Sequence, residues 1–472
     1  MLPSRFPVML DRFRHPLAAV AAALLLTVPF VATFISYGGY MTIHPGENIA
    51  PGTAVVVAGL AVLGAAFLLA WGAETAEKDV PRAFAIAVLA VLAVAPEYAV
   101  DALYAWNAGA FEGTAQGMAN ANLAVANMTG ANRILIGLGW AGIALFTVYR
   151  ARHADDPAVD HRSGFLKSAV TLDRDLALEI SFLLAATLFA FVVPLSGTTF
   201  SGNGPIGGIG LLDTLVLVGL YVLYIAIIIR GDVEEGEEHV GVPAYLQSWS
   251  KGPRIASVLA LFTYSGVLIF IAVEPFAVGL EQLGLQYGIP EFFMIQWLAP
   301  LASESPELIV VAYLVNKARS TAGFNALISS KLNQWTLLIG TLAVVYSIAA
   351  GHLGGLPFDE KQMAEIWITA AQSLFAIALL TNFEISMREA VGLLVLFVSQ
   401  VGIEFAIIQT VPEPQATALS INVLYVYTAI YLVLGAALFY ARRDALADLL
   451  GRTTTTAREA VGPERTQPER AD

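Results

Sequence analysis

The sequence predicts an all-α polytopic membrane protein with about 12 transmembrane helices, arranged as two inverted five-helix repeats plus one extra helix at each end. Three observations support this fold class. The chain of 472 residues is 57% apolar and only 13% charged, whereas soluble proteins carry about 25% charged residues. Its apolar runs are long and occur along the whole chain. Polar segments separate these runs, and lysine and arginine concentrate in every second one of those segments.

A transmembrane helix needs about 20 mostly apolar residues. The first run follows Arg5, Arg12 and Arg14 and could instead be the apolar region of a secretory signal. It extends from Leu17 to about Ile35, which is long for a signal, so we expect a retained helix. In chain order the twelve expected spans are 16–37, 52–72, 83–106, 117–149, 175–194, 209–229, 255–274 with an amphipathic continuation to about 285, 292–316, 322–350, 363–382, 389–408 and 417–440.

Orientation follows from the basic residues, which concentrate on the cytosolic side of membrane proteins. With the N-terminus inside and twelve alternating spans, the inside segments hold 22 of the 25 lysines and arginines. The outside segments hold only Lys361, and Arg133 and Lys331 fall within spans. We therefore expect both termini to be cytosolic, in the plasma membrane of a prokaryote.

Several function classes are excluded by composition and by missing motifs. A formal net charge of −13 without a basic stripe excludes nucleic-acid binding. Zero cysteines exclude disulfides and thiol catalysis. The sequence has no GxxxxGK[ST] nucleotide loop and no HExxH or GxSxG motif. We expect a transporter driven by ion gradients, not an enzyme, with no cofactor other than the transported ions.

Two Pro-Glu pairs indicate an internal repeat. Pro96-Glu97 and Pro306-Glu307 lie 210 residues apart, each near the middle of a span, and the spans that follow echo each other at 126–139 and 325–340. An offset of five helices is odd, so the two repeats must have opposite orientations in the membrane. Inverted repeats of this kind are typical of secondary transporters.

The repeat divides the chain into six segments. We expect an N-terminal extra helix within 1–51, the first repeat at 52–230, an acidic cytosolic linker at 231–254, the second repeat at 255–410, a C-terminal extra helix within 411–441 and a disordered tail at 442–472. The linker acids could form a regulatory calcium site, but they lack EF-hand spacing, and we expect a solvated linker.

Acidic side chains within the spans are the candidate cation ligands. A charge at mid-bilayer costs at least about 2.5–3.5 kcal/mol unless it has partners. Hard cations such as Ca²⁺ take about six to eight oxygen ligands. The candidate ligand set combines carboxylate, amide and hydroxyl oxygens, with Glu97 and Glu307 as the central metal ligands: Glu97, Asp101, Asn127, Asn132, Ser303, Glu304, Glu307 and Ser330.

The two prolines are expected to open the helices beside these ligands. Pro96 cannot donate a hydrogen bond to the Leu92 carbonyl, and Pro306 cannot donate one to that of Ala302. A carbonyl freed in this way must line a cavity or find a partner. An ion could supply it, although each proline alone could simply kink its helix.

These motifs resemble the calcium:cation antiporter superfamily, the sodium/calcium exchanger fold. In that family each repeat carries a Gly-Thr-Ser-x-Pro-Glu stretch, followed in the next helix by Gly-Asn-x-x-Gly-Ser-Asn. The resemblance covers about 52–410 and matches at the following positions: Pro96, Glu97, Asn127, Gly130, Asn132, Ser303, Pro306, Glu307 and Ser330. It implies two inverted five-helix repeats and cation antiport.

The sequence departs from the family pattern where sodium ligands are expected. Ala93 and Val94 replace hydroxyl residues in the first repeat. In the second, Ala326 replaces a ligand amide or carboxylate, and Lys331 stands in place of the final asparagine. These departures weaken sodium coordination and favour proton coupling over sodium coupling.

Arg133 and Lys331 are basic residues within the spans. Arg133 is expected to neutralise an acidic neighbour and hold its helix in place, because arginine keeps its proton. Lys331 could titrate together with Glu304 or Glu307, or it could fill the place of a sodium ion.

The leading hypothesis is therefore a secondary antiporter that exchanges Ca²⁺ or another cation for H⁺ or Na⁺ by alternating access. A gated cation channel, or a sodium/proton exchanger on the same fold, is the alternative, and a membrane-embedded enzyme is a third possibility. The expected partners are inorganic cations and the lipid bilayer, with no nucleic acid or nucleotide. The sequence identifies no protein partner.

Overall fold

The computed structural model describes residues 15–38, 45–80, 95–152, 156–196, 199–201, 204–230, 241–316 and 318–461. Sixteen α-helices make up most of these residues. Their bounds are α2 (Pro16–Ser36), α3 (Pro51–Ala76), α6 (Ala95–Ala110), α7 (Ala115–Ile134), α8 (Ala141–Arg150), α9 (Ala177–Ala190), α10 (Leu211–Arg230), α11 (Val242–Gln247), α12 (Lys251–Tyr287), α13 (Glu291–Asn316), α14 (Ser320–Asn333), α15 (Ile339–Ala350), α16 (Glu360–Leu380), α17 (Met387–Thr410), α18 (Gln415–Ala441) and α19 (Arg443–Val461).

Shorter elements connect or interrupt these helices. Two π-helical segments, η3 (Leu135–Trp140) and η6 (Gln334–Leu338), join α7 to α8 and α14 to α15. Two single 3₁₀ turns, η4 (Arg174–Leu176) and η5 (Val193–Leu195), flank α9. Six short strands lie in the loops: β1 (Val159–Asp160), β2 (Ala169–Thr171), β3 (Thr199–Ser201), β4 (Gly204–Ile209), β5 (Leu356–Phe358) and β6 (Glu384–Ser386).

The helices agree closely with the expected spans. Ten helices in the described residues are long and apolar enough to cross a membrane, and α13 makes eleven if its two halves, bent by 49°, count as one span. Each of these matches an expected run. The remaining expected run, 83–106, lies partly outside the described residues, and α6 is its described end. The bend in α13 falls between Ser305 and Glu307, at Pro306.

The strands form two small antiparallel sheets that the sequence analysis did not predict. One has the order β1-β2-β6 and the other β3-β4-β5. Val170 pairs with Ile385, and Gly208 pairs with Pro357, so each sheet links a segment of the first half of the chain to a segment of the second half. The sheets thus join the two halves outside the apolar spans.

The expectation of a disordered tail was wrong for residues 443–461, which form α19. Leu449 is fully buried, and Thr453 Oγ1 donates to the Ala177 carbonyl at 2.8 Å. Threonine and charged residues suggested disorder, but leucine and alanine give this helix an apolar face that packs against α9. Residues 462–472 lie outside the described part of the chain.

The expected linker is also partly folded. Its described end contains α11, and α12 already begins at Lys251. Arg254 binds Asp79 with two hydrogen bonds of 2.6 Å, Nε to Oδ2 and Nη2 to Oδ1. This pair attaches the start of α12 to the segment just after α3. The acidic cluster of the linker, from Asp232 to Glu238, lies outside the described residues.

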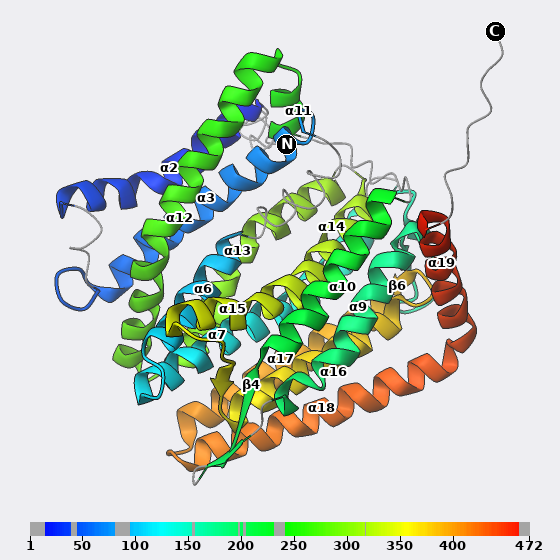
Figure 1. Cartoon of the computed structure of the whole chain (residues 1–472). Coiled ribbons are helices and arrows are strands. Elements are labelled where there is room, and N and C mark those ends of the chain that lie inside the picture. The colour runs from blue at the N-terminus through cyan, green and yellow to red at the C-terminus, as the bar shows by residue number, and fades with distance from the viewer. Residues whose placement is uncertain are drawn as a thin grey trace, which may run out of the picture.

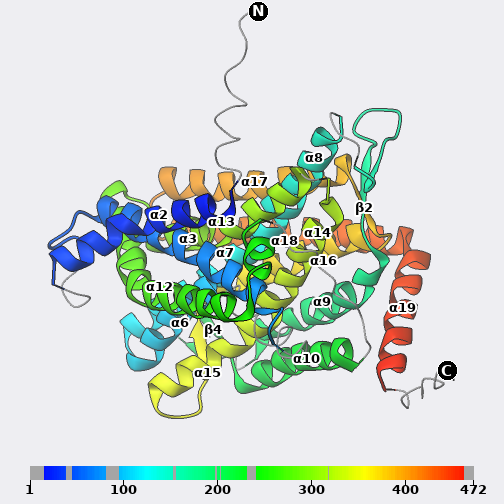
Figure 2. The same cartoon turned by 90° about the horizontal axis from the view of Figure 1, so that it is seen from above.

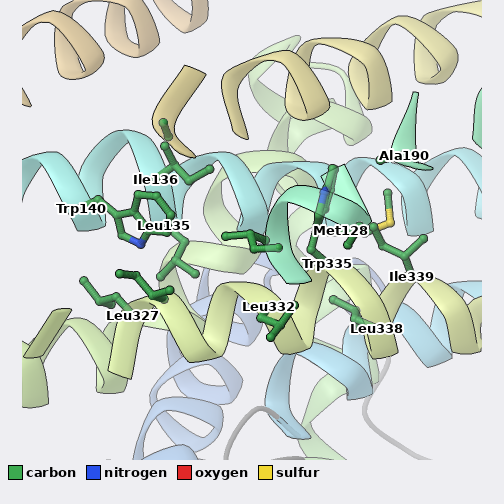
Figure 3. Close-up of a cluster of buried hydrophobic side chains, with 14 of the residues drawn as sticks. Met128, Leu135, Ile136, Trp140, Ala190, Leu327, Leu332, Trp335, Leu338 and Ile339 are labelled. Atoms are coloured by element: carbon green, nitrogen blue, oxygen red, sulfur yellow. The ribbon is translucent and has the colours of Figure 1, made fainter. Parts of the chain in front are cut away.

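The bundle is arranged around α16, the most deeply buried of the candidate spans. α2, α3 and α12 lie side by side at one edge, and α18 covers α16 along the opposite edge (Figure 1). Seen from above, α19 stands at the end of the molecule away from α2 (Figure 2). Apolar side chains of η3 and η6 pack in the interior together with side chains of α7, α14 and α15 (Figure 3).

Small residues allow α7 and α13 to approach closely. A Cβ atom added at Gly130 would lie 1.7 Å from the carbonyl oxygen of Gln296, so only glycine fits there. The contact brings the part of α7 that carries Asn127 and Asn132 against the part of α13 that precedes Ser303. The two echoing halves of the sequence therefore meet backbone to backbone.

Candidate cation site

α6 supplies two buried carboxylates to the interior. Glu97 and Asp101 are one helical turn apart and thus share a face, and their exposed fractions are 3% and 0%. Asn127 Nδ2 on α7 donates to Asp101 Oδ1 at 2.8 Å. The neighbouring expected residues Ala93 and Val94 lie outside the described part of the chain.

α13 supplies a second acidic group, which α14 and its π-helical extension contact. Ser303 and Glu304 are buried, and Glu307 is partly buried. Ser330 Oγ donates to Glu307 Oε2 at 2.9 Å, and Gln334 Nε2 donates to Glu304 Oε1 at 2.6 Å. Glu304 and Glu307 are therefore each paired with a polar residue of the element that follows α13.

The two groups meet between α6 and α13. Glu97 interacts with Ser303 and electrostatically with Asp101 and Glu307. Glu304 interacts electrostatically with both Glu97 and Glu307. The structure thus brings Glu97 and Asp101 of α6 together with Glu304 and Glu307 of α13 in one cluster.

Lys331 reaches across this cluster from α14 to α7. Its Nζ donates to Asn132 Oδ1 at 2.6 Å and to the Asn132 carbonyl oxygen at 3.3 Å. It also lies 4.3 Å from the centre of the Trp335 ring, and the side chain is fully buried. Asn132 Nδ2 donates to the Met128 carbonyl. The amide oxygen of Asn132, one of the expected cation ligands, thus accepts a hydrogen bond from Lys331.

Several oxygens of the cluster have no hydrogen-bond donor among the described residues. They are Asp101 Oδ2, Asn127 Oδ1, Glu304 Oε2 and Gln334 Oε1. A buried acceptor left without a donor costs about 1–3 kcal/mol. A cation, or protons on the carboxylates, would remove this cost. The mixture of carboxylate and amide oxygens is the ligand chemistry that Ca²⁺ takes.

The charges of the cluster are unequal. Among the described residues, this cluster contains four carboxylates, those of Glu97, Asp101, Glu304 and Glu307, and one lysine, Lys331, which interacts with Glu304. Such a group cannot stay fully ionised in a low-dielectric interior without further positive charge. The described residues contain no set of three or more His, Asp or Glu side chains arranged to hold a metal ion by themselves. Amide, hydroxyl and water oxygens would have to complete any coordination shell.

Arg133 points away from this cluster into a second buried network. Its Nη1 lies 2.6 Å from Glu365 Oε2, its Nη2 donates to Gln400 Oε1, and its guanidinium lies 4.9 Å from the centre of the Trp297 ring. The expected neutralised acid is therefore Glu365 on α16. Within the described part of the chain, Arg133 forms no hydrogen bond or ion pair with a candidate ligand.

The second network continues to Lys361. Gln400 Nε2 donates to Glu404 Oε2 at 3.1 Å, and Lys361 Nζ lies 3.0 Å from Glu404 Oε1. In this network the positive charges of Arg133 and Lys361 balance the negative charges of Glu365 and Glu404. Lys361 was expected in an outside loop, and this was wrong, because it belongs to the first turn of α16 and is only 6% exposed.

Sequence reasoning missed three residues around the cation cluster. Gln334 binds Glu304, and Tyr98 donates to Asn333 Oδ1 at 3.3 Å, which links α6 to α14. Gln334 lies one turn beyond Ser330, so its position on the same helix face was a usable signal. No comparable signal identified Tyr98 or Asn333, since aromatic and amide residues occur in many spans.

The π-helical segments stand at equivalent places in the two halves. η3 begins directly after Ile134, and η6 begins directly after Asn333. Such segments are rare and frequently lie at functional sites. Here each follows the helix that carries the candidate amide and hydroxyl ligands, α7 or α14.

Comparison with known proteins gives consistent results. A family model described as "Sodium/calcium exchanger protein" matches residues 51–230 and 257–406. The crystal structure of the H⁺/Ca²⁺ exchanger CAX is similar at 41% sequence identity and a TM-score of 0.77, covering 94% of this chain and 98% of that one. The structure of native YfkE shares the fold at 14% identity and a TM-score of 0.53, covering 83% and 98%. A search of curated proteins finds no match.

Proposed function

The chain belongs to the sodium/calcium exchanger family, and we propose that it exchanges Ca²⁺ or a similar cation for protons at the Glu97–Glu307 cluster. It is a multi-pass integral membrane protein and a cation exchanger, a transporter and not an enzyme. The proposal concerns the residues that bind the cation and the ion that drives exchange.

One observation carries the proposal. Carboxylates from both halves of the chain meet in a cluster in which several buried oxygens have no hydrogen-bond donor among the described residues. Glu97 and Asp101 come from α6, and Glu304 and Glu307 from α13. Loss of a divalent cation would leave these acids uncompensated, and protons can replace it on the same oxygens. If the charge of the cluster is conserved, two protons exchange for each divalent ion.

Proton coupling is supported by two further points. The H⁺/Ca²⁺ exchanger CAX is 41% identical to this chain. In the second repeat, Ala326 and Lys331 stand at two positions where the family carries sodium ligands. Lys331 also donates a hydrogen bond to Asn132 Oδ1. These residues leave carboxylates as the groups best suited to bind the exchanged ions.

The architecture we propose for this function has twelve spans, with 52–230 and 255–410 as inverted repeats and both termini in the cytosol of a prokaryotic cell. The family model matches the chain in two segments with almost these limits, 51–230 and 257–406. The equivalent positions of η3 and η6 also support the repeat. Alternating access would then expose one central site to each side in turn.

The test replaces the central carboxylates without changing their shape. Glu97→Gln and Glu307→Gln should each abolish Ca²⁺ exchange in proteoliposomes, because the charge that binds the cation is lost. Asp101→Asn should be milder, raising the KM by about tenfold, or about 1.4 kcal/mol, since Asp101 lies one turn away and Asn127 already contacts it.

Glu274→Gln is the matched control, because it removes a carboxylate from a spanning helix, α12, outside the cluster. All variants should elute as monodisperse protein in detergent. Unimpaired exchange in both glutamine variants at Glu97 and Glu307 would place the site elsewhere.

A further inference from the structure

We propose that the Lys331 ammonium is a built-in monovalent cation, filling a place in the cluster that a free monovalent cation would otherwise occupy. The proposal rests on the cation site proposed above and names a residue that determines its ion specificity. It concerns the charge and position of the ammonium, whichever ion drives exchange.

The surroundings of Lys331 Nζ are those of a bound cation. Two oxygens of one residue, Asn132 Oδ1 and the Asn132 carbonyl, lie at 2.6 and 3.3 Å. The face of the Trp335 ring lies 4.3 Å away, which is favourable for a positive charge. Amide and carbonyl oxygens also hold monovalent metal ions where they replace water.

Acidic oxygens complete this environment. Glu304 interacts electrostatically with Lys331, and Glu304 Oε2 has no hydrogen-bond donor among the described residues. Gln334 Oε1, on the residue that binds Glu304, also lacks one there. Without the ammonium, the Asn132 oxygens would lose their donor and the buried Glu304 carboxylate would lose a compensating charge.

A tethered charge has a functional consequence. A free monovalent ion can leave with each transport cycle, whereas Lys331 is covalently attached to α14 and cannot. When Ca²⁺ exchanges for Ca²⁺, the chain should therefore require neither sodium nor potassium. Removing the ammonium should create such a requirement.

Lys361 provides a matched control within the same molecule. It is also a buried lysine beside an aromatic ring, with its Nζ 3.2 Å from the centre of the Phe292 ring. Its partner is Glu404, in the balanced network of Arg133 and Glu365. Lys361 therefore compensates a single carboxylate away from the cation cluster.

The experiment measures Ca²⁺ counterflow in proteoliposomes, which needs cation binding and alternating access but no particular coupling ion. Wild type, Lys331→Ala, Lys331→Met and Lys361→Ala are compared in choline, sodium, potassium and methylammonium chloride. Wild type should be equally active in all four. Lys331→Ala should lose at least about tenfold in choline and recover in methylammonium or sodium.

Lys331→Met should stay inactive in every salt, because its side chain fills the space without supplying charge. The counterflow activity of Lys361→Ala should be the same in all four salts. A wild type that requires sodium or potassium, a folded Lys331→Ala that no monovalent cation restores, or equal restoration of Lys361→Ala would overturn the proposal.

If Lys331→Ala folds poorly, its melting temperature in methylammonium relative to choline becomes the readout. A higher value in methylammonium supports the proposal, and equal values contradict it. Failure of the proton coupling would look different: wild type would show normal counterflow, with the expected salt responses of the variants, but no uptake driven by a pH gradient.

Discussion

At the scale of single residues, the charges of the two buried clusters explain their different roles. The cluster around Glu97 has four carboxylates and one ammonium, so it needs added positive charge. The cluster around Arg133 has two cations and two carboxylates and needs none. This excess of acid is why we propose cation binding for the first cluster and a structural role for the second.

The ion pair of His352 and Glu112 should depend on pH. His352 Nε2 lies 2.6 Å from Glu112 Oε2, and both side chains are exposed in loops. The hydrogen bond with Glu112 raises the pKa of His352 above its ordinary value of 6.5, and the same bond lowers the pKa of Glu112. The ion pair should therefore form at pH values between the pKa of Glu112 and the pKa of His352.

The stability that His352 contributes should be complete below pH 6.5 and disappear as the pH rises through its raised pKa. The contribution of Glu112 should disappear as the pH falls through its lowered pKa. In Glu112→Gln, the imidazole should titrate near its ordinary value when followed by NMR. An unchanged titration in this variant would show that Glu112 does not hold the proton on His352.

The limits of sequence reasoning are clearest at Lys331 and Lys361. Glu97 and Glu307 could be predicted because acids near mid-span are costly and occur in equivalent places. The partner of Lys331 could not, because Asn132 lies 199 residues away on another helix. Lys361 was misplaced because a lysine at the end of an apolar run ordinarily faces solvent, whereas here Glu404 and Phe292 hold it inside.

At the scale of helices, the Arg133–Glu365 pair fixes α7 to α16. Removing one member of a buried ion pair costs about 3–5 kcal/mol, because the other charge is left alone. Glu365→Gln and Arg133→Gln should each lower the melting temperature in detergent strongly. The double variant should regain part of the loss, since it leaves no lone charge. A double variant less stable than both single variants would contradict a charge-pair role.

Helix positions could be predicted well because each span needs about 20 apolar residues. The segments outside the spans could not. α19 and the two sheets depend on partners far away in the sequence, such as Ala177 for Thr453 and Ile385 for Val170. Their residues are polar or form short runs, and hydropathy alone does not identify such contacts.

At the scale of the whole molecule, the alternation of basic residues predicts the membrane orientation. The chain has no cysteine, so single cysteines can be labelled without removing others. Phe165 and Leu353 are 80% and 79% exposed, in loops that the proposed topology places on opposite sides. Leu353→Cys should react with an impermeant maleimide on intact cells, and Phe165→Cys only after permeabilisation. Labelling of both from one side would contradict the odd number of spans between them.

Proton-coupled exchange at the Glu97–Glu307 cluster can be tested by Ca²⁺ uptake into proteoliposomes at zero sodium, driven by an imposed pH gradient. We expect uptake when the interior is acidic, no uptake without the gradient and none in Glu97→Gln. With two protons exchanged per divalent ion, a clamped membrane potential should leave the uptake unchanged. Uptake that requires sodium on one side and is independent of the pH gradient would contradict proton-coupled exchange.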